Sequence, residues 1–156
     1  MKLFVGSDHM GYPLKAAVLE HLLARGHEIT DVGTRAGEKG HYPVYAELVA
    51  RAVLEGRCER GLLFCGSGEG VNIVANKFAG IRSAWCNTPQ AALLSRQHND
   101  ANILAMGTDF VSAQLGCELA DLWLETQFLG GRHNLKLRLI EHIEREGTCL
   151  PYGTYN

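Results

Sequence analysis

The sequence predicts a three-layer α/β/α sandwich around a five-stranded parallel sheet, a Rossmann-like α/β fold. Short apolar runs alternate with helical patterns along the whole chain. The runs are brief and almost wholly apolar, as are parallel strands that are covered on both faces. Because strand–helix–strand connections are right-handed, this alternation places the strands in one sheet with helices on either side.

Five strands are expected, and their boundaries follow from the apolar runs. They cover residues 3–5, 28–32, 61–64, 83–86 and 103–105. Each strand is followed by an apolar stripe of helical period, and one further stripe comes after the fifth. The six stripes lie within residues 14–23, 44–55, 71–78, 91–95, 115–123 and 135–143. Pro13 and Pro43 lie near two helix starts, and Gly26 follows a helix end. In the second helix the stripe consists of Val44, Leu48, Ala52 and Glu55.

Composition limits the class of protein. A chain of 156 residues with 46% hydrophobic and 21% charged residues suits one domain, residues 1–156, with an irregular Gly/Pro/Tyr-rich tail at 147–156. A formal charge of −2 argues against a nucleic-acid partner. No apolar run reaches the roughly 18 residues that span a membrane, and none has the form of a signal peptide, so we expect a cytoplasmic protein. Five cysteines without a C-x-x-C pair suggest neither a disulfide framework nor a zinc site.

Polar residues gather where the predicted strands end. Ligands of open α/β sheets bind beyond the carboxyl ends of the strands. Asp8 and His9 follow the first strand, the segment 65–70 (CGSGEG) follows the third, and Asp109 follows the fifth. His98 and Asn99 close the fourth helix, just before the fifth strand. We therefore expect the functional site in these segments.

The segment 65–70 is the most informative of these. Its alternate glycines, Gly66, Gly68 and Gly70, allow a tight turn that exposes several N–H groups, and the following helix adds the positive end of its dipole. Such a loop suits an anion and favours the thiolate form of Cys65, whereas the carboxylate of Glu69 opposes it. A tight turn around a buried cysteine would also explain the glycines alone.

Other chemistries of glycine-rich loops do not fit this spacing. The dinucleotide pattern G-x-G-x-x-G is absent, and Asn87 stands where that fold needs an acid. The chain has no Gly-Lys pair for a phosphate-binding P-loop, and Val71 stands where a cysteine phosphatase needs arginine. What remains is proton transfer next to a carbonyl: the thiolate removes the proton, the amides stabilise the enediolate, and Asp8, His9 and His98 face the same site.

Several motifs together resemble one family. They are GSDHMGYPLK from residue 6, HYPVYA from 41, CGSGEGVNIVANKFAGIR from 65, SRQHNDANILAMG from 95 and GGRH from 130. In this order they are similar to the ribose-5-phosphate isomerase B (LacAB/RpiB) family over about residues 2–145. The resemblance implies an aldose–ketose isomerase that works through a cis-enediolate, with no metal or organic cofactor.

The resemblance also implies roles for individual residues. Cys65 would be the general base, and His98 would open the sugar ring. Ser67 and the backbone of residues 66–70 would hold the enediolate, with Asn99 at the carbonyl end. The other implied substrate-binding residues are Asp8, His9, Tyr42, Gly66, Gly68, Glu69, Gly70, Asp109, Arg132, His133 and Lys136.

Sites of the family lie at a homodimer interface, and dimers often pair into tetramers. His98 and Asn99 would accordingly face Cys65 of a partner chain. The helix at residues 112–127 would contribute to assembly.

Three positions depart from the family pattern, and they leave the substrate open. Asp109 and Lys136 stand where members that use sugar phosphates usually carry phosphate-binding arginines, whereas Arg132 is unchanged. His41 stands where an aspartate commonly precedes Tyr42. One alternative is therefore the same chemistry on an unphosphorylated or different aldose, such as free ribose or allose. A second alternative is a non-catalytic sugar- or nucleotide-binding module.

Overall fold

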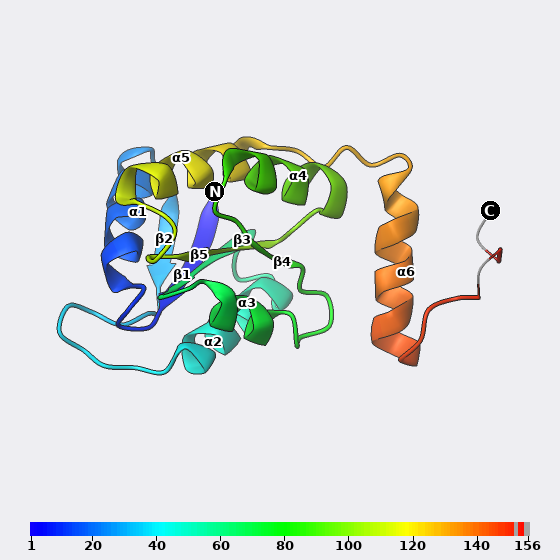
Figure 1. Cartoon of the computed structure of the whole chain (residues 1–156), viewed down its shortest axis with the longest axis horizontal. Helices are drawn as coiled ribbons and strands as arrows, with labels where there is room; N and C mark the ends of the chain where they lie inside the picture. The colour runs from blue at the N-terminus through cyan, green and yellow to red at the C-terminus, as the bar shows by residue number, and fades with distance from the viewer. Residues whose placement is uncertain (152, 155–156) are drawn as a thin grey trace.

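The computed structural model describes residues 1–151 and 153–154, and its centre is a parallel sheet (Figure 1). The strands are β1 (Lys2–Ser7), β2 (Glu28–Asp31), β3 (Arg60–Cys65), β4 (Ser83–Trp85) and β5 (Ile103–Gly107). They pair in the order β2-β1-β3-β5-β4, and every pair is parallel. The five predicted strands and the α/β sandwich are confirmed, with strand ends shifted by one or two residues.

Helices cover both faces of the sheet. They are α1 (Tyr12–Ala24), α2 (Tyr42–Leu54), α3 (Glu69–Ala75), α4 (Pro89–Asn99), α5 (Ala113–Glu125) and α6 (His133–Glu146). Figure 1 shows α1, α4 and α5 on one face, α2 and α3 on the other, and α6 standing apart from both layers. In the described part of the chain, no helix combines the length and apolar character that crossing a membrane requires. Residues 147–151 of the predicted tail are neither helix nor strand, and residues 152, 155 and 156 lie outside the described residues.

Strand β3 shows how the two layers are separated. Successive side chains of a strand point to opposite faces. Leu62 and Phe64 therefore pack into the core beneath α1, α4 and α5, whereas Leu63 and Cys65 join the core beneath α2 and α3. This alternation points the last residue of the strand, Cys65, toward the α2 and α3 side.

The predicted apolar stripe of α2 is wrong at Val44 and Leu48, whereas Ala52 is buried as predicted. Val44 and Leu48 are 55% and 41% exposed, and the buried face is made of small residues such as Ala46 and Ala50. The helix approaches the sheet closely, because a Cβ on Gly61 of β3 would lie 2.5 Å from Val49. Such close packing selects the alanine face of a helix that is apolar almost all round.

Helix α6 forms as predicted, but its apolar face is not buried by its own chain. Ile140 and Ile143 are 36% and 43% exposed. They line a cavity of about 500 Å³ between α6 and the β4 edge of the sheet, opposite Ala84 and Asn99. The chain itself therefore leaves this face of α6 without a covering layer.

A buried lysine anchors the segment that leads to Tyr42. The side chain of Lys15 is 1% exposed, and its Nζ donates to both carboxylate oxygens of Asp31 at 2.7 and 2.8 Å and to the carbonyl of Thr34 at 2.7 Å. The ammonium group also lies 5.5 Å from the centre of the Tyr12 ring. These contacts satisfy the buried charge and fix the exit of β2.

Replacing Lys15 tests this anchor. Lys15→Met should lower the free energy of unfolding by about 2–3 kcal/mol, because it leaves the half-buried Asp31 carboxylate without its partner. Urea denaturation followed by circular dichroism measures the loss. Lys2→Met is the matched control, since it removes an exposed pair with Glu28 and should cost about 0.5 kcal/mol or less. Equal effects of the two substitutions would contradict the anchoring role.

Candidate active site

The order of the strands locates the site. From β1 the chain moves to β2 on one side, and β3 then lies on the other side of β1. A crevice opens at such a switch point beyond the carboxyl ends of the strands. Ser7 is paired with Phe64, and Cys65 is paired with Gly107, so the segments that follow β1, β3 and β5 lie side by side.

One backbone amide is hydrogen-bonded to the sulfur of Cys65. The side chain is buried, and its Sγ accepts a hydrogen bond from the N–H of Gly68 at 3.1 Å. Within the described residues, the N–H groups of Gly66 and Ser67 donate to no other group. The loop thus offers one amide to the sulfur and leaves two for an anionic oxygen beside it.

Packing against Trp85 fixes the shape of this loop. Gly68 has φ = +81°, and a Cβ at this residue would lie 2.7 Å from the indole ring. The indole Nε1–H donates to the carbonyl of Ser67 at 3.0 Å, and the ring meets Phe110 edge-on with centroids 5.8 Å apart. Sequence reasoning missed Trp85, because nothing in the pattern of β4 shows that its indole reaches a loop carbonyl.

Polar side chains from three further segments form the rim of the site. Oδ1 of the buried Asp8 accepts the N–H of Gly11 at 2.9 Å. Three more side chains of the rim lie against neighbouring backbone. His9 Nδ1 lies 3.2 Å from the carbonyl of Gly40. The Tyr42 ring packs against Gly70, and the Asp109 carboxylate lies beside Gly66. The Thr108 hydroxyl, which sequence reasoning left without a role, donates to the carbonyl of Met10 at 3.2 Å and ties the β1 and β5 segments together.

Three other cysteines pack as small hydrophobic residues: Cys58 and Cys86 are buried, and Cys117 is partly buried. Burial raises the pKa of Cys86 to about 11, and burial also raises the pKa of Cys58 and of Cys117. At neutral pH these three thiols are neutral. Their environments differ from that of Cys65, whose sulfur accepts a backbone amide at the end of a strand.

The prediction drawn from the strand ends, that His98 faces the site of Cys65, is wrong within one chain, whereas the implied contact with Cys65 of a partner chain stays a prediction. Helix α4 starts beyond the carboxyl end of β4 and returns to the opposite edge of the sheet, where β5 begins. At that edge the carbonyl of Asn102 accepts the N–H of Gly61, the second residue of β3. His98 and Asn99, at the end of α4, therefore lie at the amino edge of the strands, across the sheet from the thiol.

A second cluster forms around His98 at this edge. The ring of His133 stacks on that of His98, with centroids 4.3 Å apart and planes 10° from parallel. His133 is 5% exposed, and burial together with the charges of His98, Arg132 and Lys136 lowers its pKa. Arg132 and Lys136 are exposed beside it. One chain thus carries two half-sites: a thiol with carboxylates at the carboxyl edge, and imidazoles with cationic side chains at the amino edge.

Comparison with known proteins identifies the family of the chain. Residues 3–140 match the family described as Ribose/Galactose Isomerase. The chain is 46% identical over 144 residues to ribose-5-phosphate isomerase B of Escherichia coli, covering 92% of this chain and 97% of that protein.

Solved structures of ribose-5-phosphate isomerases B have the same fold as this chain. That of Clostridium thermocellum ribose-5-phosphate isomerase B is 44% identical, with a TM-score of 0.92 over 95% of this chain and 100% of the other. The Mycoplasma genitalium enzyme, solved with bound ribulose-5-phosphate, is 35% identical, with a TM-score of 0.86 over 93% and 97% of the two chains.

Fold and site define an α/β enzyme whose thiol is held by backbone amides, and the reaction class expected from the sequence, aldose–ketose isomerisation, is confirmed. The chain belongs to the ribose/galactose isomerase family.

The conformation of the thiol loop can be tested at Gly68. Gly68→Ala should lower the free energy of unfolding by about 1–3 kcal/mol more than Gly26→Ala, because the new methyl group overlaps the Trp85 ring. Gly26 is a matched control: its φ is +80°, and a Cβ there meets nothing within 4 Å. Thermal and urea unfolding measure both losses, and isomerase activity should fall only in Gly68→Ala. Equal losses of stability would show that the indole does not constrain the loop.

Proposed function

We propose that this chain interconverts ribose 5-phosphate and ribulose 5-phosphate. The observation that carries the proposal is the Cys65 sulfur at the carboxyl edge of the sheet, with the Gly68 amide bound to it and two free amides beside it. The same chemistry is named in the relatives, one of which was solved with ribulose-5-phosphate. A non-catalytic binding module has no use for a thiol in this setting.

The proposed reaction moves one proton between neighbouring carbons. The Cys65 thiolate takes the proton from C2 of the opened aldose, and the electron pair of that C–H bond flows to the aldehyde oxygen. The N–H groups of Gly66 and Ser67 stabilise the resulting enediolate oxygen. The thiol returns the proton to C1 while the proton on the C2 oxygen passes to the C1 oxygen, which yields the ketose.

The second half-site is proposed to come from another copy of this chain. His98 and Asn99 lie across the sheet from their own Cys65, so in one chain they cannot open the ring of a sugar bound at that thiol. The charges of the two half-sites are complementary: the thiol loop carries Glu69 and has the Asp109 carboxylate beside Gly66, and the cationic residues lie in the other half-site. Its Arg132 and Lys136 would then bind the phosphate.

A homodimer, or a pair of dimers, also gives the apolar face of α6 a partner. Ile140 and Ile143 are exposed, and the cavity that they line reaches Asn99 of the second half-site. A second copy entering this cavity would cover the isoleucines and bring its thiol loop toward the imidazoles. The apolar residues of α5, expected from the sequence to help assembly, pack mostly within their own chain, so the support for assembly comes chiefly from α6.

An unphosphorylated aldose is the second candidate, and one observation favours it. The carboxylate of Asp109 lies beside Gly66 at the rim of the thiol loop, 3.5 Å from where a Cβ of that glycine would be. A carboxylate repels a phosphate and accepts hydrogen bonds from sugar hydroxyls. The named activities of the relatives favour the phosphate ester, and they make it the main proposal.

A panel of aldoses separates the two candidates. Ribose 5-phosphate should be turned over with a kcat/KM about 100-fold or more above that of free ribose or allose, because the phosphate adds charge-assisted hydrogen bonds to Arg132 and Lys136. Coupled spectrophotometric assays measure each sugar. Asp109→Asn should raise kcat/KM for the phosphate ester by about 3- to 10-fold and leave that for ribose nearly unchanged. A preference for the free sugars would establish the second candidate instead.

Mixing two inactive variants tests the shared site. Cys65→Ala and His98→Asn should each lose most isomerase activity as pure proteins. In a mixed dimer one of the two sites keeps both native residues, so equimolar mixing with subunit exchange should restore about a quarter of the wild-type activity. A double variant, Cys65→Ala with His98→Asn, mixed with either single variant controls for the exchange procedure. No recovery after verified exchange would place both residues in one subunit's site.

A further inference from the structure

We propose that Asp100 is a positioning residue for ring opening, because it holds in place the turn that presents His98 and Asn99. This inference rests on the role given to His98 in the proposed function. Asp100 follows Asn99 directly and ends helix α4.

The backbone of Asp100 is in an unusual conformation. Its φ and ψ are +46° and +45°, and it is the one residue other than glycine with positive φ among the residues that the structure describes. Residues with a Cβ adopt this left-handed conformation uncommonly, and aspartate does so more readily than most. The N–H of Asp100 bonds to the carbonyl of Arg96, so this conformation closes the last turn of α4 immediately after His98 and Asn99.

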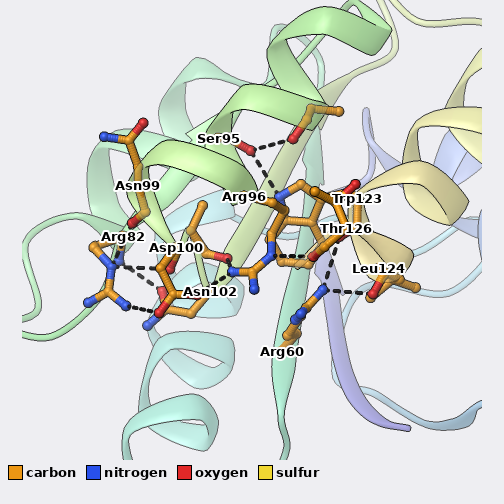
Figure 2. A network of polar contacts seen from close by, with 12 residues as sticks. Arg60, Arg82, Ser95, Arg96, Asn99, Asp100, Asn102, Trp123, Leu124 and Thr126 are labelled. Atoms are coloured by element: carbon orange, nitrogen blue, oxygen red, sulfur yellow. Dashed lines mark hydrogen bonds and ion pairs between the residues drawn. The ribbon is translucent and has the colours of Figure 1, made fainter. Parts of the chain in front are cut away.

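The carboxylate of Asp100 joins two arginines (Figure 2). Its Oδ1 accepts from Arg96 at 2.8 Å, and its Oδ2 accepts from Arg82 at 3.1 Å. Nε of Arg82 also donates to the backbone carbonyls of Asn99 at 3.0 Å and of Asp100 at 3.1 Å. The guanidinium of Arg82 therefore binds both the Asp100 side chain and the main chain of the turn.

Both arginines are fixed to the body of the fold. Arg96 is 5% exposed, donates to the carbonyls of Thr126 and Ala101, and lies over the Trp123 ring at 5.6 Å. The backbone N–H of Arg82 donates to the side chain of Asn102 at 2.8 Å, where β5 is about to begin. The turn is thus tied to the end of α5 and to the sheet.

A further buried arginine gives the carboxylate an electrostatic role. Arg60 packs on the same Trp123 ring at 5.2 Å and donates to the carbonyls of Trp123 and Leu124 (Figure 2). Burial and the charge of Arg96 lower the pKa of Arg60 to about 10, and the charge of Asp100 opposes that shift. Asp100 therefore partly balances a group of buried cations and cannot be replaced by a neutral residue without loss.

This arrangement fixes the imidazole that would act on the sugar ring. The salt-bridged clamp formed by Asp100, Arg82 and Arg96 holds the backbone of α4 just after His98. The stacked ring of His133 holds the plane of the His98 imidazole. One residue before His98, the carbonyl of Gln97 accepts the N–H of Leu129 at 3.1 Å, which keeps the chain before α6 in place. Because both carboxylate oxygens of Asp100 are engaged by arginines, it acts on the reaction through His98.

The chemistry of the substrate provides a way to isolate this role. Ribose 5-phosphate is mainly a closed ring and must be opened before proton transfer. In ribulose 5-phosphate the 5-hydroxyl carries the phosphate and cannot close a five-membered ring on C2, so Cys65 can exchange the C1 hydrogen with solvent without any ring step. A displaced His98 therefore slows aldose turnover and spares this exchange.

The experiment measures both rates in Asp100→Ala, Asp100→Gly and Asp100→Asn. The first rate is aldose turnover, and the second is deuterium entry at C1 of ribulose 5-phosphate in D₂O, followed by NMR. Asp100→Ala should lower kcat for ribose 5-phosphate by about 10- to 100-fold, the cost of a misplaced catalytic group, and should lower exchange at least about 5-fold less, because exchange loses only the contact of Asn99 at the carbonyl end. Asp100→Gly fits the left-handed backbone without strain and keeps the test valid if alanine prevents folding. Asp100→Asn keeps the side-chain shape and should recover part of the turnover.

Two further variants make the outcomes distinct. Glu47→Gln is the matched control, because it breaks an exposed pair with Arg51 of the same i, i+4 spacing on α2 and should change neither rate. His98→Asn is the reference for a missing imidazole. An equal fall of both rates in the Asp100 variants, or no fall, would overturn the positioning role while His98→Asn still separates the rates. If His98→Asn does not separate them, the role of His98 in the proposed function fails, and the inference fails with it.

Discussion

The hydrogen bond from the Gly68 amide to the Cys65 sulfur is the contact on which the rest of the site depends. It forms only if the chain turns sharply within three residues after β3, and the left-handed conformation of Gly68 makes that turn. Close contact with Gly107 also matters, since a Cβ there would lie 2.2 Å from the carbonyl carbon of Ser67. A thiol at the end of a buried strand, packed on one side against the core, in this way gains a backbone donor on the other.

The two half-sites differ in how they are built. Around the thiol, the loop is shaped by glycines and by one indole, and its polar groups are mainly backbone amides. Around His98, the shape comes from charged side chains, with Asp100 between Arg82 and Arg96. A backbone cradle suits a transient oxyanion, because amide dipoles need no counter-charge. A salt-bridged clamp suits a helix end that projects toward another surface, because it resists bending of that end.

The sequence predicted those parts of the fold that buried strands reveal. Strand β3, for example, is a continuous apolar run that ends at Cys65, and the glycines after it show where the turn lies. The covered face of α2 could not be predicted, because the helix is apolar nearly all round and the close approach at Gly61 decides which face is buried. The position of His98 just before β5 puts it at the amino edge of the sheet, which excludes a site at the strand ends of one chain and leaves the implied partner-chain site a prediction. Trp85 and Asp100 went unnoticed, because an indole bond to a loop carbonyl and a left-handed aspartate leave no periodic pattern.

The positions of the two tryptophans give the enzyme a pair of internal optical reporters. Trp85 is partly exposed and touches the loop that cradles the thiol, whereas Trp123 is fully buried between two guanidinium groups beneath the His98 turn. Indole emission depends on polarity and on nearby charge, so each ring senses a different half of the catalytic machinery. Replacing either ring by phenylalanine would leave a single emitter, and ligand arrival at one half could then be followed separately from motion at the other.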